Sequence, residues 1–151
     1  MLSEYSDVQK IAKETIEYIK TEIRPGMSLL EVRRLCEEKM IILGAESFWY
    51  WDVGAFVFAG DETTVSVSGK EYITSDRIIE SDDIITIDLS PQIGDTWGDY
   101  ARTIIIEKGN KTKLSDVSYF TFEPHISAPG SKYGYKREDI YYFDNDTIKK
   151  L

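Results

Sequence analysis

Apolar side chains in the first 45 residues recur at helical spacing. Over residues 4–24 they fall three or four positions apart, which predicts an amphipathic helix with one buried face. A Pro-Gly pair ends this pattern, and Ser28 with Glu31 forms a capping-box signature that predicts a second helix over residues 28–43. Gly44 follows where the carboxyl-terminal cap of a helix belongs. We expect the two helices to form a hairpin that packs on a sheet.

The rest of the chain shows the shorter patterns of β-strands, which are rich in β-branched and aromatic residues. We expect strands at residues 53–58, 63–68, 84–90, 99–106, 117–126 and 139–143. Residues 91–95 are predicted to be the turn between two of them. An aromatic run at residues 48–51 predicts core packing, with a pocket wall as the alternative. Because neither a repeat nor a linker interrupts the sequence, a single domain over residues 1–151 is expected.

Composition narrows the classes of partner. The formal net charge is -9 and the isoelectric point is near 4.7, which argues against nucleic acid or an anionic membrane as partner. The single cysteine, Cys36, excludes an intramolecular disulfide and a cysteine-rich zinc site, and it falls on an apolar helix face. No apolar run reaches the ~18 residues of a membrane-spanning helix, and no signal-peptide pattern begins the chain, so we expect a cytoplasmic protein.

Asp88 and Asp99 lie eleven residues apart, each at a predicted strand. A hairpin of that length can bring the two carboxylates side by side. Adjacent buried carboxylates repel each other, and each is costly to desolvate without a partner. A hard divalent cation between them removes both costs, because such ions accept oxygen ligands. The alternative is a structural role, in which Asp99 ends a turn and Asp88 caps a strand edge.

Two glutamates and the only histidine extend this set. Alternation along residues 119–123 places Glu123 on the face opposite to the phenylalanines, and Glu138 begins another predicted strand. Together with the two aspartates they form a ligand set suited to a pair of bridged divalent ions. His125 shares the face of Glu123. It is either an acid–base group that lines the site, with an ordinary pKa of about 6.5, or a structural residue at a strand end.

Four short segments follow one another in a characteristic order. Residues 23–28 read Ile-Arg-Pro-Gly-Met-Ser, and residues 84–88 read Ile-Ile-Thr-Ile-Asp, followed by Gly-Asp at 98–99. Residues 120–124 read Phe-Thr-Phe-Glu-Pro, and residues 136–140 read Lys-Arg-Glu-Asp-Ile. In this order they resemble segments of the methionine aminopeptidase, Xaa-Pro peptidase and creatinase family. The aromatic run and the Glu-Pro-His sequence make the chain most similar to the Xaa-Pro peptidase-like members.

The resemblance implies a pita-bread fold, an α+β architecture in which an N-terminal helical hairpin packs on a curved, mainly antiparallel sheet. It implies Asp88, Asp99, Glu123 and Glu138 as ligands of one or two divalent ions, which would be Mn, Co, Fe or Zn. Glu123 would also carry protons, and His125 is the second catalytic candidate. The implied function is a metal-dependent, Xaa-Pro peptidase-like aminopeptidase, in which a metal-activated water cleaves N-terminal residues from peptides.

The sequence also departs from the family pattern. Only 23 residues separate Asp99 from Glu123, too few for the family's second helical pair and without its ligand histidine, so the fold is expected to be incomplete near residues 107–108. Ser68 and Gly69 stand where the family has a catalytic His-Gly pair. These departures predict weak metal binding and little turnover. They favour the alternative function, a catalytically inactive module for binding or assembly. A calcium-binding domain is disfavoured because no Asp-rich loop is present.

The missing helices also bear on assembly. Large apolar residues are expected on both faces of the sheet, where the second helical pair would have covered them. These residues are Ile85, Ile87, Ile104, Ile106, Phe120 and Phe122. We therefore expect a homodimer that buries this surface. The alternative is a curled sheet that the two predicted helices cover alone.

Overall fold

The computed structural model describes residues 2–106, 119–122, 125–126, 135–136, 139–144 and 147–150. They belong to two compact units, Met1–Gly109 and Asn110–Leu151. None of the described helices is both long and apolar enough to span a membrane.

Two helices open the first unit, α1 (Leu2–Glu22) and α2 (Leu29–Ile42), close to their predicted bounds. The Ser28 hydroxyl caps α2 by accepting a hydrogen bond of 3.1 Å from the Glu31 backbone N–H. Gly44 follows α2 with a φ of +107°, a conformation in which a side chain would be strained. The predicted cap and stop signals of the second helix are therefore confirmed.

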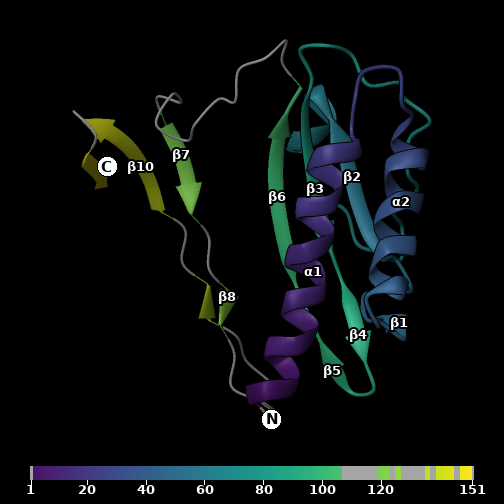
Figure 1. Ribbon diagram of the computed structural model, residues 1–151. Coiled ribbons are helices and arrows are strands. Elements are labelled where there is room, and N and C mark those ends of the chain that lie inside the picture. Colours follow the sequence, from purple (N-terminus) through teal and green to yellow (C-terminus); the bar gives the residue numbers. More distant parts are fainter. Residues whose placement is uncertain are drawn as a thin grey trace. The chain divides into compact units, whose positions relative to one another are not determined.

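The strands of this unit form two small antiparallel sheets (Figure 1). The main sheet has the order β2-β3-β6, formed by β2 (Ala55–Ala59), β3 (Ile84–Leu89) and β6 (Tyr100–Ile105). The second has the order β1-β4-β5, formed by β1 (Ser47–Phe48), β4 (Pro91–Ile93) and β5 (Thr96–Trp97). The main sheet thus places residues from both sides of the 60–83 segment next to one another.

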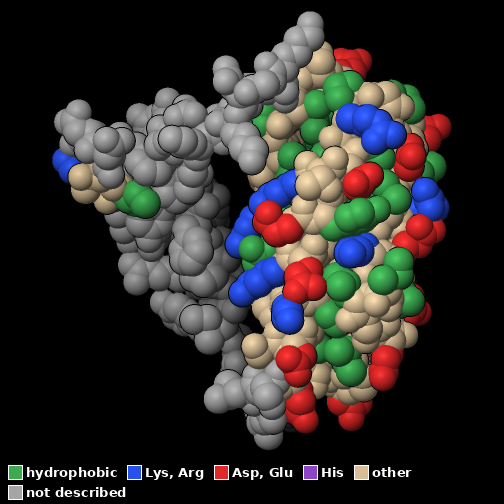
Figure 2. Space-filling model, viewed as in Figure 1, with side chains coloured by type: hydrophobic (Ala, Val, Ile, Leu, Met, Phe, Trp, Pro, Cys, Tyr) green, Lys and Arg blue, Asp and Glu red, His purple; other side chains and the backbone are tan. Residues whose placement is uncertain are grey.

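The two helices pack on one face of the main sheet (Figure 1). Neither of them covers the other face, which is called the open face below and where Phe56 packs against Tyr72. Ile85, Ile87 and Leu89 point to the helices and are fully buried, whereas Thr86 and Asp88 point to the open face. The helical surface seen in Figure 2 carries acidic and basic side chains intermixed along both helices. Because side chains alternate between the two faces of a strand, only every second residue of β3 reaches the open face.

This arrangement corrects the expectation of large apolar residues on both faces. Ile85, Ile87 and Ile106 are buried in the same core, and Ile104 packs against it. The side chains of Phe120 and Phe122 lie outside the described part of the chain. The four isoleucines therefore need no partner subunit to cover them. The homodimer stays a prediction, which sedimentation at micromolar concentration would test.

The buried stripe of α2 includes Cys36, whose side chain is fully buried among core residues of both helices and the sheet. Burial raises the pKa of its thiol to about 12. The predicted packing role of this cysteine is confirmed.

Two predictions between the strands are wrong in part. Residues 63–68 were expected to be a strand, but a short 3-10 helix, η1 (Gly60–Thr64), begins this stretch. The Thr63 hydroxyl donates to the Gly60 carbonyl and the Thr64 hydroxyl to the Asp61 carbonyl, so local side-chain hydrogen bonds stabilise the turn over a strand. Residues 91–95, expected to be a turn, contain β4 and only a tight turn after it, at Gly94 and Asp95.

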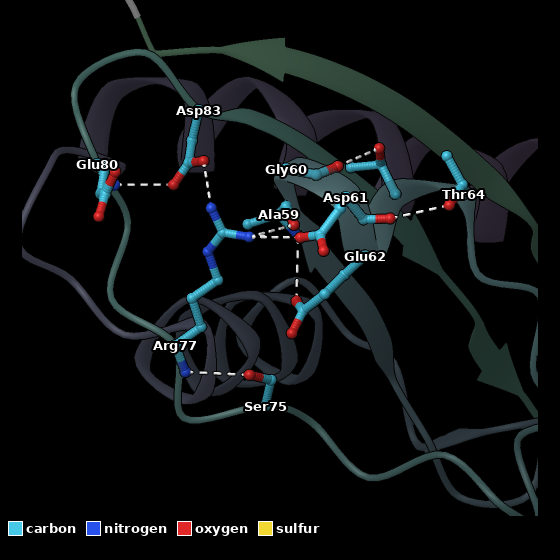
Figure 3. A network of polar contacts seen from close by, with 10 residues as sticks. Ala59, Gly60, Asp61, Glu62, Thr64, Ser75, Arg77, Glu80 and Asp83 are labelled. Carbon is cyan, nitrogen blue, oxygen red and sulfur yellow. Dashed lines mark hydrogen bonds and ion pairs between the residues drawn. The ribbon is translucent and has the colours of Figure 1, made fainter.

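Arg77 ties η1 to the loop before β3 (Figure 3). Its guanidinium donates to an Asp83 carboxylate oxygen at 2.6 Å, to the Ala59 carbonyl at 2.8 Å and to Asp61 at 3.2 Å. The other Asp83 oxygen accepts from the Glu80 backbone N–H at 2.8 Å. This contact network fixes both ends of the segment that borders the open face of the sheet.

In the second unit, the residues that the structure describes form strands. β7 (Tyr119–Phe122), β10 (Asp139–Asp144) and β11 (Thr147–Lys150) form a sheet of order β11-β10-β7. β8 (His125–Ile126) pairs with β9 (Tyr135–Lys136). The strands predicted within residues 117–126 and 139–143 are confirmed in these positions.

Candidate metal centre

Asp88 and Asp99 meet on the open face of the main sheet. In the antiparallel register of β3 and β6, Asp88 lies opposite Ala101. Asp99 lies two residues before Ala101, so alternation turns its side chain to the same face. The two carboxyl groups share a side-chain hydrogen bond. The prediction that these residues are neighbours in space is confirmed.

The electrostatics of Asp88 follow from this placement. The residue as a whole is exposed, but protein atoms around its carboxyl group remove part of the solvent from it. This desolvation is the largest cause that raises the pKa of Asp88 to about 7, and the negative charge of Asp99 is the second. A hydrogen bond from the Leu89 backbone opposes both. Two close carboxyl groups, one of which resists ionisation, are the electrostatic setting that a cation would relieve.

A side chain of α1 and one that directly follows β1 hold the backbone around Asp99. The Gln9 amide donates to the Asp99 carbonyl at 2.7 Å and accepts from the Asp99 N–H at 3.2 Å. The indole N–H of Trp49 donates to the Gly98 carbonyl at 2.8 Å. A Cβ at Gly98 would lie 2.8 Å from the Val8 side chain, so this turn passes close to α1. Asp99 is therefore positioned by contacts with segments far away in the sequence.

A hollow of about 300 Å³ lies on the open face beside Asp88. Phe56 lies opposite Asp88 in the register of β2 and β3 and lines this hollow with Tyr50 and Phe58. Of the aromatic run at residues 48–51, Tyr50 is thus a pocket wall, whereas Trp49 and Trp51 are 37% and 59% exposed. Core packing, the first interpretation of this run, holds for Phe48, which packs against the main core, whereas the alternative of a pocket wall holds for Tyr50.

The other predicted site residues belong to the second unit. Glu123 and Glu138 lie outside the described residues. His125 begins β8, where its backbone pairs with Lys136. Within the described residues no group of three or more His, Cys, Asp or Glu side chains is placed to hold a metal ion. The structure thus brings together the two aspartates, and the two glutamate ligands stay predictions.

Sequence reasoning missed Gln9, Phe56 and Phe58, which support the site. Gln9 is separated from Asp99 by 90 positions, and no local pattern signals their contact. Phe56 and Phe58 could have been found, because alternation along residues 55–59 puts them on the face opposite the helices. Their position opposite Asp88 and Thr86 depends on the strand register, which only the fold provides.

Known proteins are similar to this chain in sequence profile and in fold. The sequence profile described as metallopeptidase family M24 matches residues 3–118. Comparison with curated protein sequences gives no significant match.

Several solved structures share the fold. The Xaa-Pro dipeptidase from Bacillus anthracis aligns with a TM-score of 0.62 at 17% identity, over 99% of this chain and 59% of its own. The prolidase from Pyrococcus furiosus aligns with a TM-score of 0.62 at 16% identity, over 99% of this chain and 62% of its own. The X-Pro aminopeptidase from Thermotoga maritima MSB8 aligns with a TM-score of 0.60 at 16% identity, over 99% of this chain and 59% of its own. The chain thus spans about three-fifths of the length of these proteins.

Proposed function

Because the chain belongs to metallopeptidase family M24, we propose that it acts as a metal-dependent, aminopeptidase-like hydrolase on peptides with an Xaa-Pro bond near the N-terminus. The observation that carries this proposal is the contact between the carboxyl groups of Asp88 and Asp99 on an open sheet face. The similarity to Xaa-Pro peptidases and prolidases supports the substrate class.

The two aspartates fit a divalent cation. Both donors are carboxylate oxygens, the ligands that hard divalent ions accept. Desolvation and the charge of Asp99 already raise the pKa of Asp88. Glu123 and Glu138 are the proposed remaining ligands. A bound ion of Mn, Co, Fe or Zn would supply a water of lowered pKa and polarise the scissile carbonyl.

The chain's own residues have distinct tasks in this proposal. Gln9 and Trp49 fix the turn that carries Asp99, so its carboxylate stays in contact with that of Asp88. The aromatic wall formed by Tyr50, Phe56 and Phe58 offers an apolar surface beside the carboxyl pair, suited to a proline ring or an apolar side chain. Glu123 and His125 are the proposed acid–base groups.

Metal titration tests the site separately from turnover. Isothermal titration of the full chain with Mn²⁺ should give a Kd that weakens at least about tenfold in Asp88→Asn and in Asp99→Asn. The matched control is Asp95→Asn, an exposed aspartate in the turn before β5, which should change nothing. Glu123→Gln and Glu138→Gln should weaken binding as the aspartate variants do. A wild-type chain that binds Mn²⁺ no better than Asp99→Asn would refute the metal centre.

A second candidate is a non-catalytic binding module with the same fold. It is favoured by the single histidine in the chain, since the family resemblance implies histidines at positions such as Ser68. Hydrolysis of Ala-Pro-Ala with Mn²⁺ separates the two functions. Release of alanine that Asp99→Asn abolishes supports the hydrolase, and peptide binding without hydrolysis supports the module.

A further inference from the structure

A second hollow lies next to the one that contains Asp88. It has a volume of about 260 Å³ and lies between β2 and the segment that follows η1. Its apolar lining includes Phe58, Val65, Val67 and Tyr72. Pockets for whole drug-sized ligands measure roughly 300–1,000 Å³, so this one suits a single long side chain better than a complete small molecule.

The Tyr72 ring is a fixed part of this lining. Its hydroxyl accepts from the Val57 N–H at 2.7 Å and donates to the Val57 carbonyl at 3.0 Å. The ring packs against Phe56 and Phe58, with centroids 4.5 and 5.4 Å away. The hollow therefore has a rigid aromatic floor on the sheet side.

The charged groups of the hollow have one sign. Glu62 and Glu71 both belong to the lining, and it contains neither a lysine nor an arginine. Arg33, whose guanidinium lies 5.7 Å from the centre of the Tyr72 ring, is already paired with Glu37 at 2.8 Å and is not part of the lining. An apolar cavity with two carboxylates is complementary to a ligand with an apolar stem and a cationic end.

We propose that this hollow receives the side chain of a lysine or arginine residue of a bound peptide. The methylene stem of such a side chain would cover the apolar lining, while its cationic head would meet Glu62 and Glu71. The aromatic rings add cation–π attraction. A purely apolar side chain would desolvate the carboxylates without compensation, and an acidic one would be repelled.

The position of the hollow links this preference to the metal centre. Phe58, Val65 and Val67 line both hollows, so the two are continuous along the open face. A peptide held beside Asp88 can thus place a neighbouring side chain next to Tyr72. The inference rests on the proposed function for its ligand class, a peptide, and adds that the peptide carries a basic residue next to its proline.

Three peptides of equal length test the preference. Binding of Lys-Pro-Ala, norleucine-Pro-Ala and Glu-Pro-Ala to the full chain is measured by isothermal titration, each with and without Mn²⁺. Norleucine has the same number of side-chain carbons as lysine but no charge. The lysine peptide should bind about threefold to fivefold more tightly than the norleucine peptide, as expected for a partly exposed charge pair, and the glutamate peptide most weakly. The difference should shrink in 0.5 M salt, because exposed charges are screened.

Two substitutions locate the effect. Glu71→Gln removes an exposed charge and should bring the lysine and norleucine peptides to equal affinity or close to it. Glu62→Gln should act in the same direction. Glu62 also accepts a hydrogen bond of 3.4 Å from the Ala59 N–H, so the thermal unfolding of the Glu62→Gln variant is measured as well. Glu80→Gln is the control, because this exposed glutamate is not part of the lining of either hollow.

The outcomes separate this inference from the metal centre. Equal binding of the lysine and norleucine peptides by the wild type, no binding of either, or an undiminished preference in Glu71→Gln would each overturn it. A lysine preference that persists in a chain without Mn²⁺ affinity would support the hollow while contradicting the proposed hydrolase.

Discussion

The carboxyl group of Asp88 shares a hydrogen bond with that of Asp99, which lies diagonally across the antiparallel pair of β3 and β6. Two ionised carboxylates at such a contact repel each other, so one proton between them is favourable near neutral pH. The same contact that suits a cation therefore makes the metal-free chain sensitive to pH.

We expect the free energy of unfolding to fall as pH rises from about 4 to about 7. The folded-state pKa of Asp88, about 7, lies above the ordinary aspartate value of about 3.9, so in this window the folded state holds the extra proton. The stability from this proton is complete below pH 4 and is lost as pH rises through 7. Urea unfolding of the metal-free wild type and Asp88→Asn at several pH values measures it. If the difference between the two proteins does not vary with pH, the raised pKa is refuted.

Gln9→Met should destabilise the chain by about 1–2 kcal/mol, because two hydrogen bonds to the Asp99 backbone are lost while the side-chain volume is kept. Gln9→Glu retains the acceptor for the Asp99 N–H but loses the donor to the Asp99 carbonyl. Its stability should therefore lie between those of the wild type and Gln9→Met. Chemical denaturation gives both values. Equal stability of all three proteins would show that the Gln9 contacts do not hold this turn.

Arg77→Met should cost about 3 kcal/mol of stability, because it leaves the Asp83 carboxylate, whose side chain is only 8% exposed, without its cation. The double variant with Asp83→Asn should recover part of this loss, since the buried charge is then also removed. A double-mutant cycle by urea unfolding measures the coupling. Strictly additive effects would mean that the 2.6 Å ion pair contributes nothing net.

Ser68→His should raise the turnover of Ala-Pro-Ala with Mn²⁺ by at least tenfold. The family resemblance places a catalytic histidine here, and a positioned acid–base group contributes about 10²–10⁴ to a rate. Ser68 is half-buried, next to Val67 of the hollow lining, so a larger side chain can be tried there. Alanine release is measured in parallel for Ser68→His and Ser68→Ala. Turnover that is no higher in Ser68→His than in Ser68→Ala would contradict the assignment.

The helices and the aspartate pair could be predicted from sequence because their signals are local. Helical spacing, the Ser28 cap and Gly44 indicate the ends of α2. The eleven-residue spacing of two strand segments indicates that Asp88 and Asp99 are neighbours. The conformation of residues 63–68 could not be predicted, because β-branched residues indicate a strand whereas the Thr63 and Thr64 hydroxyls donate to backbone carbonyls of η1. Contacts such as Gln9 with Asp99 depend on how α1 docks on the sheet, which no local pattern records.

The buried position of Cys36 gives the molecule an internal reporter of its own opening. It is the only thiol in the chain, and a thiol reagent reacts with thiolate, which is scarce for a buried group with a pKa of about 12. Alkylation of the native protein therefore requires α2 to separate from the sheet, so the labelling rate measures how often that occurs. No engineered probe is needed to follow the folding of this unit or its response to Mn²⁺.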